Sequence, residues 1–258
     1  MIEKKELQEY ARLKGLSLGN AEKDYLIELT LLSISQHLKN ELIFKGGTCL
    51  YKFHKLSRFS EDLDFSAVDE IDIDKLINLT LKYLNKFNIK AIQYRKKEPH
   101  NSILIKLRME GPLYSGNPAT YASIGIDINL KSNVNLEPEA LSLKSVYPEI
   151  PSISILCMKK EEIFAEKIRA IMTRNKARDL FDLYFLLTND VYCKKKIIEE
   201  KMKYYNKEFS VKNLISEIKK FKRIWEKELK GFTKTLPEFK DVNKFVSKRL
   251  LEIYKNDL

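Results

Sequence analysis

The chain has 258 residues, of which 44% are hydrophobic, enough for a sizeable core in one large domain or two small ones. We expect a cytoplasmic protein, because the first residues are charged where a secretory signal would be apolar and no apolar run approaches the ~20 residues of a membrane span. The 3 cysteines and 3 histidines show no ligand-pair spacing, which argues against structural zinc and a disulfide framework.

The net charge of +11 is concentrated in the C-terminal part of the chain. Residues 158–258 hold 26 Lys and Arg against 16 Asp and Glu, a balance of +10, whereas residues 1–157 hold 21 against 20, a balance of +1. This asymmetry suits a partner with a phosphate backbone and predicts that RNA binding resides mainly in the C-terminal part. A lysine-rich composition would also make any solvated helix basic, so charge alone leaves both interpretations open.

The first elements in chain order are two helices, at 4–14 and 21–39, the second with Asn20 as its N-cap. Asp24 in the second helix is expected to be solvated or paired with a cation. A strand at 42–44, two glycines and a helix near 48–55 follow, and a second strand then carries Asp62 and Asp64.

This second stretch indicates a site for phosphate and metal. Gly46 and Gly47 let backbone N–H groups approach an anion at the start of a helix. In a strand, Asp62 and Asp64 point to the same face and can bind a hard cation together. Each pattern alone is more often a tight turn or a solvated strand end. An EF-hand loop starting at Asp62 is excluded, because it would need glycine and glutamate where the chain has Ala67 and Ile73.

A helix is expected at 73–87, strands at 89–95 and 102–109, and a loop at 110–120. Residues 124–130 alternate strictly between apolar and polar, with Asp127 on the polar face, where a lone aspartate is usually solvated. Prolines punctuate the stretch 135–152, which we interpret as a linker. The remaining residues read as helices, at 159–173, 177–188, 193–205, 211–229 and 238–256. This predicts an α/β domain over 1–150 and a basic helical domain over 151–258.

Lys167 falls inside the apolar stripe of the helix at 159–173. Such a lysine either snorkels to water or meets a phosphate or carboxylate. If Lys167 binds phosphate, Lys167→Met is predicted to preserve or raise the melting temperature, whereas snorkelling predicts little change. Asp179 and Asp182 share a face of the next helix, with Arg174 and Arg178 nearby, and an ion-pair cluster bracing two helices would explain Asp179 and Arg178 without any catalytic role.

Three motifs taken together resemble the nucleotidyltransferase superfamily, in the form carried by the AbiEii/AbiGii and MenT-like toxins. They are Gly46-Gly47-Thr48, Ser60-Glu61-Asp62-Leu63-Asp64, and the later Glu166-Lys167 with Arg178-Asp179-Leu180-Phe181-Asp182. The resemblance spans roughly residues 20–190. It implies an α+β fold: a nucleotidyltransferase-type mixed sheet with flanking helices, followed by an all-helical C-terminal domain.

The resemblance also implies roles for individual residues. It makes Asp62, Asp64, Lys167 and Asp182 catalytic, with Asp182 reaching the active site from the helical domain. The implied metal ligands are Asp62, Asp64 and Asp127, and the implied nucleotide-binding residues are Gly46, Gly47, Thr48, Arg58, Ser60 and Lys167. The chain departs from related proteins at Gly125, where they often carry lysine.

The activity implied by the resemblance is Mg²⁺-dependent transfer of a nucleoside monophosphate from an NTP to an RNA hydroxyl, such as the 3′ end of tRNA. The protein would be the toxin of a toxin–antitoxin or phage-defence (abortive-infection) pair, with a cognate antitoxin as partner. Two alternatives stay open: a housekeeping nucleotidyltransferase acting on a protein or small molecule, and a non-catalytic nucleotide- or RNA-binding module. The intact Ser60-to-Asp64 motif favours catalysis over the second alternative.

Overall fold

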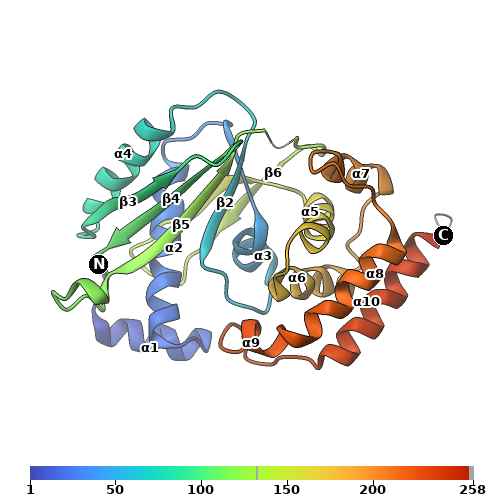
Figure 1. Ribbon diagram of the computed structural model, residues 1–258. Coiled ribbons are helices and arrows are strands. Elements are labelled where there is room, and N and C mark those ends of the chain that lie inside the picture. The colour runs from blue at the N-terminus through green and yellow to red at the C-terminus, as the bar shows by residue number, and fades with distance from the viewer. Residues whose placement is uncertain (132, 256–258) are drawn as a thin grey trace. The chain divides into compact units, whose positions relative to one another are not determined.

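The computed structural model describes residues 1–131 and 133–255, and the chain divides into two compact units (Figure 1). The first unit consists of Met1–Lys55, Phe59–Val134 and Pro138–Cys157, and the second of Leu56–Arg58, Asn135–Glu137 and Met158–Leu258. Two short segments that precede Met158 in the sequence thus belong to the second unit. The chain therefore passes between the units after Lys55, Arg58, Val134, Glu137 and Cys157.

The first unit is built on one mixed sheet which, over the described residues, has seven strands in the order β3-β4-β5-β2-β1-β7-β6 (Figure 1). Strand β2 pairs parallel with β5 and β1 parallel with β7, while the other neighbours are antiparallel. The strands are β1 Leu42–Lys45, β2 Asp62–Ala67, β3 Ala91–Lys97, β4 Ser102–Met109, β5 Ala122–Asn129, β6 Glu139–Leu143 and β7 Ile153–Cys157.

Alternation along the strands separates an apolar face from a polar one. Alternate residues of β4 and β5 are buried, from Ile103 to Met109 and from Ala122 to Ile128. Helix α2 packs on the sheet and contacts β2, β5 and β7. The helices of this unit are α1 Lys4–Lys14, α2 Leu18–Ser35, α3 Gly46–His54 and α4 Ile73–Asn85, with a short 3₁₀ helix at Pro118–Thr120.

Helix α2 begins earlier than the sequence predicts. Its N-cap is Ser17, whose hydroxyl accepts a hydrogen bond from the backbone N–H of Asn20, the residue expected to be the cap. Both residues are good caps, so local propensity did not separate them. The helix is buried on several sides, and its charged residues Asp24 and Glu28 are buried with it.

The expected linker at 135–152 contains strand β6, and β7 follows it directly. The prolines there lie outside the strands, with Pro138 just before β6 and Pro151 two residues before β7. Because β7 pairs with β1 and β6, the residues up to Cys157 belong to the first unit.

The second unit is helical. Helix α5 packs against α6, α7 and α8, and α10 packs against α6 and α8. The helix expected at 211–229 is broken into α8, a 3₁₀ turn at Phe221–Arg223 and α9. The helices are α5 Lys160–Thr173, α6 Ala177–Thr188, α7 Lys195–Lys203, α8 Val211–Lys220, α9 Trp225–Leu229 and α10 Phe239–Ile253.

Buried polar contacts hold the segment Asn135–Glu137 in the second unit. The fully buried Glu162 accepts hydrogen bonds from the backbone N–H groups of Asn135 and Leu136, at 2.8 and 2.9 Å. Lys201 pairs with the same carboxylate. The expected fold class, a mixed sheet with flanking helices and a helical C-terminal part, is confirmed. None of the helices in the described residues is long and apolar enough to cross a membrane.

Candidate active site

Asp62, Asp64 and Asp127 lie on the same face of the sheet. Strands β2 and β5 are parallel neighbours whose register places Asp64 opposite Asp127 and Asp62 opposite Gly125. Register partners in a sheet project to the same side, and residues two apart on a strand do so as well. Asp62 is exposed and the other two carboxylates are half-buried. The sheet therefore gathers the three aspartates that the sequence identified.

Two glycines have no side chain where the Asp62 and Asp64 carboxylates lie, and so make room for them. A Cβ at Gly125 would lie 2.6 Å from Asp62 Oδ1, and a Cβ at Gly46 would overlap the Asp64 carboxylate. Gly46 also has a φ of +76°, a conformation in which an L side chain is strained. The sequence suggested a phosphate role for Gly46 but no reason for Gly125. The register supplies that reason, because Gly125 is the β5 residue facing Asp62.

Gly125→Ala tests this packing. Because the clashing atom is the far end of a flexible carboxylate, we expect the fold to survive while Asp62 is displaced. Nucleotide transfer should fall by about tenfold or more, as expected when a catalytic group loses its position by about 1 Å. The matched control is Gly19→Ala in α2, where a Cβ would meet nothing within 4 Å. Transfer rates and melting temperatures of both variants are the measurement, and a fully active Gly125→Ala would contradict the packing argument.

Helix α3 begins at Gly46, directly beside these carboxylates. The first backbone N–H groups of a helix have no intrahelical partner and can bind an anion. Thr48 is buried, and its hydroxyl is hydrogen-bonded to Ser60 Oγ at 2.9 Å and to the backbone carbonyl of Asp62 at 2.5 Å. The Thr48 side chain thus fixes the start of α3 to the start of β2. Because the Thr48 hydroxyl is used in these contacts, the backbone N–H groups are the groups of this segment that suit a phosphate.

Lys45 is a residue that the sequence analysis missed. It is the last residue of β1, it stands opposite Asp64 in the register and it is 7% exposed. A buried ammonium group on the face of the carboxylates fits a site that handles anions. The signal was available in the sequence: with Phe44 pointing into the core, alternation sends Lys45 to the other face.

The donor set suits magnesium. Mg²⁺ prefers oxygen ligands and is usually bound by one or two carboxylates together with waters and substrate phosphates. The three aspartates are all oxygen donors, and Gly46 and Gly125 keep side chains out of the space next to two of them. Within residues 1–131 and 133–255, no group of three or more His, Cys, Asp or Glu side chains is arranged so that it could hold a metal ion by itself. A site completed by substrate phosphates does not require one.

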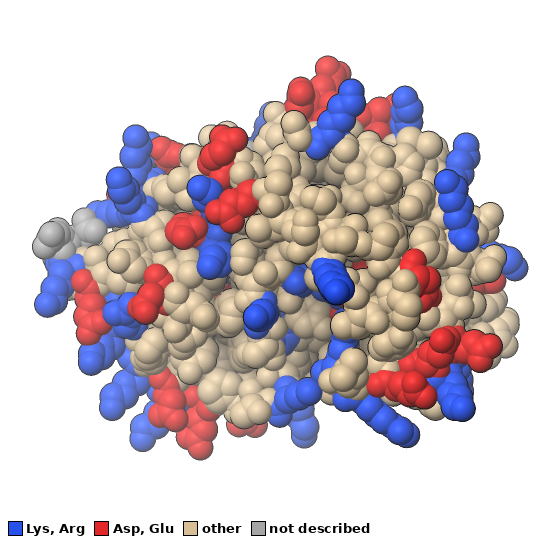
Figure 2. Space-filling model, turned by 180° about the vertical axis from the view of Figure 1, so that it is seen from behind, with Lys and Arg blue, Asp and Glu red and all other residues tan. Residues whose placement is uncertain are grey.

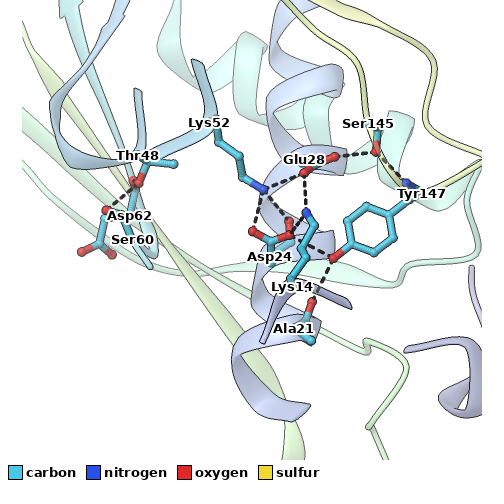
Figure 3. Close-up of polar contacts among 10 residues, drawn as sticks. All are labelled: Lys14, Ala21, Asp24, Glu28, Thr48, Lys52, Ser60, Asp62, Ser145 and Tyr147. Carbon is cyan, nitrogen blue, oxygen red and sulfur yellow. Dashed lines mark hydrogen bonds and ion pairs between the residues drawn. The ribbon is translucent and has the colours of Figure 1, made fainter. Parts of the chain in front are cut away.

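A buried ionic network holds the other end of helix α3 (Figure 3). Lys52 binds Asp24 and Glu28 of α2, at 2.6 Å each, and Lys14 of α1 pairs with the same two carboxylates. Tyr147 donates a hydrogen bond to Asp24 at 3.0 Å. Lys52 lies one helical turn after Thr48, so the network fixes the helix whose first turn borders the aspartates. Asp24 is therefore a paired residue, one of the two outcomes expected for it.

Asp24 gives the network a pH dependence. Its burial favours the neutral acid, but attraction to Lys52 and Lys14 outweighs burial and lowers its pKa to about 2. A folded-state pKa below the unfolded value of about 3.9 stabilises the fold above pH 4, and this contribution is lost as pH falls towards 2. It amounts to about 2–3 kcal/mol.

We expect Asp24→Asn to be less stable at pH 7, where it leaves the buried Lys52 ammonium and the half-buried Lys14 with one carboxylate, Glu28. It should also lose less stability between pH 4 and pH 2 than the wild type. Urea unfolding at pH 7, 4, 3 and 2 measures both effects. Parallel pH curves for the two proteins would show that Asp24 does not carry this dependence.

Lys167, Asp182 and Arg58 meet inside the second unit. Lys167 Nζ lies 2.8 Å from Asp182 Oδ2 and 3.1 Å from Asp179 Oδ1. Arg58 holds both oxygens of Asp182, with its Nε and one terminal nitrogen at 2.7 Å each. Asp182 is fully buried, and the side chains of Lys167 and Arg58 are 9% and 3% exposed. Lys167 therefore does not snorkel; two carboxylates neutralise it.

Asp179 extends this cluster to the surface. It binds Arg174, at 2.8 and 3.0 Å, as well as Lys167, so the expected ion-pair brace between α5 and α6 exists. Burial opposes the charge on Lys167, but Asp182 and Asp179 outweigh it and raise the Lys167 pKa. The Arg178 guanidinium lies over the Phe232 ring, 5.8 Å from its centre. Through these contacts, Lys167, Arg58 and Arg174 are connected to one another by the two carboxylates Asp179 and Asp182.

A mixed sheet that brings three aspartates to one face, beside a glycine-bounded helix start, is the arrangement expected of a nucleotidyltransferase. A family model described as nucleotidyl transferase AbiEii toxin, type IV toxin–antitoxin system, matches residues 30–248. The chain belongs to this family. It is thus an enzyme of the nucleotidyltransferase class and the toxin of a toxin–antitoxin system, with an NTP as substrate and an antitoxin as partner. Enzymes of this kind are typically metal-dependent.

Solved structures share the fold at low sequence identity. MenT4, a nucleotidyltransferase toxin from Mycobacterium tuberculosis, is 18% identical with a TM-score of 0.65, over 100% of this chain and 91% of that one. JHP933 from Helicobacter pylori is 21% identical with a TM-score of 0.57, over 93% of this chain and 94% of that one. No curated protein matches the chain in sequence.

Proposed function

We propose that this toxin transfers a nucleoside monophosphate from an NTP to a hydroxyl group of RNA, such as the 3′ end of tRNA. The observation that carries the proposal is the set of Asp62, Asp64 and Asp127 on one sheet face beside the start of α3. The acceptor oxygen forms a bond to the α-phosphorus, and the bond from that phosphorus to the bridging oxygen breaks. Pyrophosphate leaves with the electron pair, and the hydroxyl proton passes to solvent.

Asp62 and Asp64 would hold Mg²⁺, with Asp127 as a third ligand. When bound, the metal activates the attacking hydroxyl and stabilises the leaving oxygens. The backbone N–H groups at Gly46, Gly47 and Thr48 bind the triphosphate, and Ser60, fixed by Thr48, lines the same segment. These residues bind the phosphates of the NTP and not its base. The choice among the NTPs therefore depends on other contacts.

Lys167 and Arg58 are proposed to contribute positive charge to nucleotide binding. Support comes from the convergence of both cations on Asp182, which holds two positively charged groups next to each other. Asp182 holds both cations through close contacts, so we assign it the role of keeping them charged and oriented. Its proposed catalytic effect therefore acts through Lys167 and Arg58.

The test is to incubate the purified protein with each α-labelled NTP, Mg²⁺ and total RNA. We expect label to appear on RNA, one pyrophosphate to be released for each nucleotide added, and EDTA to stop the reaction. Label on a protein or small molecule, and none on RNA, would show that the acceptor is not RNA. Absence of transfer from every NTP would contradict the proposal.

A further inference from the structure

Beyond the aspartates, the same face of the sheet continues onto two strands rich in basic residues. The row that contains Asp62 and Gly125 continues through Lys106 on β4 to Arg95 on β3. The next row runs from Asp64 through Asp127 and Leu104 to Lys97. Arg108 follows Lys106 by two residues and faces the same side. We call Arg95, Lys97, Lys106 and Arg108 the basic strip.

No acidic residue lies on the two strands that carry the basic strip, β3 and β4. In the described part of the chain, the side chains of Arg95, Lys97 and Lys106 are exposed and form no ion pair. Lys96, which points to the other face, is instead paired with Asp74 at 2.8 Å and Glu98 at 2.9 Å. The unneutralised cations of β3 thus gather on the face that bears the catalytic aspartates.

An aromatic ring accompanies these cations. The Arg108 guanidinium lies 3.4 Å from the centre of the Tyr94 ring, and Tyr94 is exposed. Interleaved cations and aromatic side chains are the pattern by which proteins bind single-stranded nucleic acid, through backbone charge and base stacking. Total charge would not have located this surface. On the face shown in Figure 2, Lys and Arg side chains are interspersed with Asp and Glu.

Spacing links the basic strip to the site of transfer. Neighbouring strands lie about 4.8 Å apart, so Lys106 is about 10 Å and Arg95 about 14 Å from Asp62, measured along the backbone row. The β5 residue between Asp62 and Lys106 is Gly125. Because glycine has no side chain, none stands between Asp62 and the basic strip in this row. A flexible strand reaching Asp62 can therefore lie across β5 onto β4 and β3.

We propose that the basic strip binds the backbone phosphates of the RNA acceptor, in the nucleotides next to the reacting hydroxyl, and that Tyr94 stacks on one of their bases. This inference rests on the proposed function. An RNA strand is favoured over an acidic protein because the cations are aligned in rows with the aspartates where transfer occurs. The strip acts on the acceptor alone, since the NTP phosphates are bound at the start of α3.

The test compares two double variants with equal change in net charge. Arg95→Gln/Lys106→Gln removes two cations of the strip. The control, Lys82→Gln/Lys96→Gln, removes an exposed lysine of α4 and the lysine of β3 that points away. Full-length proteins are assayed for transfer to RNA at several salt concentrations, with KM measured separately for RNA and for the NTP.

We expect Arg95→Gln/Lys106→Gln to raise KM for RNA by about tenfold or more, as expected when charge-assisted hydrogen bonds to phosphate are removed. The dependence of log KM on log salt should become shallower by about 0.7 for each phosphate that the protein no longer neutralises. Both kcat at saturating RNA and KM for the NTP should stay unchanged, as should all parameters of the control.

If the Arg95→Gln/Lys106→Gln variant is active and its KM for RNA is unchanged, the assignment of the basic strip to RNA is overturned. This holds even if the variant is inhibited differently by the antitoxin, which would indicate that the strip binds an acidic protein. That result would leave the proposed function standing. Wild-type protein that transfers nucleotides to no RNA would instead refute the proposed function, and the strip would fall with it. If the control variant showed the same rise in KM for RNA, the effect would come from net charge and not from the position of the cations. That result would also overturn the assignment.

Discussion

Replacing Asp64 by alanine is expected to reduce nucleotide transfer by about 10³-fold or more while the protein stays folded. Asp64 is the central carboxylate of the site, because it faces Asp127 on β5 and Lys45 on β1 in the same row. Loss of one preorganised hydrogen-bond donor in an active site typically costs about 10²–10³ in rate, and we expect a metal ligand to contribute more because it also places the ion. Its half-buried position beside another carboxylate makes its removal tolerable for folding.

Asp64→Asn separates charge from shape. It keeps the volume that Gly46 accommodates and should lose as much activity as Asp64→Ala. Glu70→Ala, an exposed acid shortly after β2, is the matched control and should retain full transfer. Transfer of labelled nucleotide and thermal melting measure both properties. A near-wild-type rate in either Asp64 variant would remove Asp64 from the proposed metal ligands.

Replacing Lys167 by methionine is expected to destabilise the second unit by about 3–5 kcal/mol, the usual cost of breaking a buried ion pair by removing one partner. The sequence predicted the opposite, an unchanged or higher melting temperature, and the reason for the difference is the surroundings of the ammonium. It is neutralised by Asp179 and Asp182, which are 2% and 0% exposed and would be left without the cation that they share.

A double-mutant cycle with Asp179→Asn tests this explanation. The two residues contact each other directly, so their effects on the free energy of unfolding should not add, and the coupling should exceed about 0.5 kcal/mol. Urea unfolding of the two single variants and the double variant provides the measurement. Arg249→Met serves as control, because its partner Asp190 is exposed and the loss should stay below about 1 kcal/mol. A stability of Lys167→Met equal to wild type would show that the cluster does not support the fold.

The parts of the site that the sequence predicted are those with local signals. The strand, paired glycines and helix from Leu42 to His54, and the two aspartates of β2, follow from alternation and from glycine chemistry over a few residues. Asp127 was also found, because β5 alternates strictly. These patterns require no knowledge of which elements are neighbours.

What could not be predicted depends on contacts between distant elements. The role of Gly125 appears only when β5 is placed beside β2, and the environment of Lys167 only when α6 packs on α5. Strands β6 and β7 were missed because three prolines near them outweighed the short alternating runs. The rows that connect Asp62 to Lys106 and Arg95 are likewise a property of strand order.

Because the sequence segments of the two units alternate along the chain, recombination between genes cannot easily exchange one unit alone. The helical unit is not one continuous stretch of sequence: it needs Leu56–Arg58, which supplies the guanidinium on Asp182, and Asn135–Glu137, which supplies two N–H groups to Glu162. A fragment starting at Met158 would leave both carboxylates buried without these partners. Recombination at the end of β7 would therefore not transfer the helical unit as an intact module. Its surface can diverge freely, but its exchange between genes requires the intervening sheet to move with it.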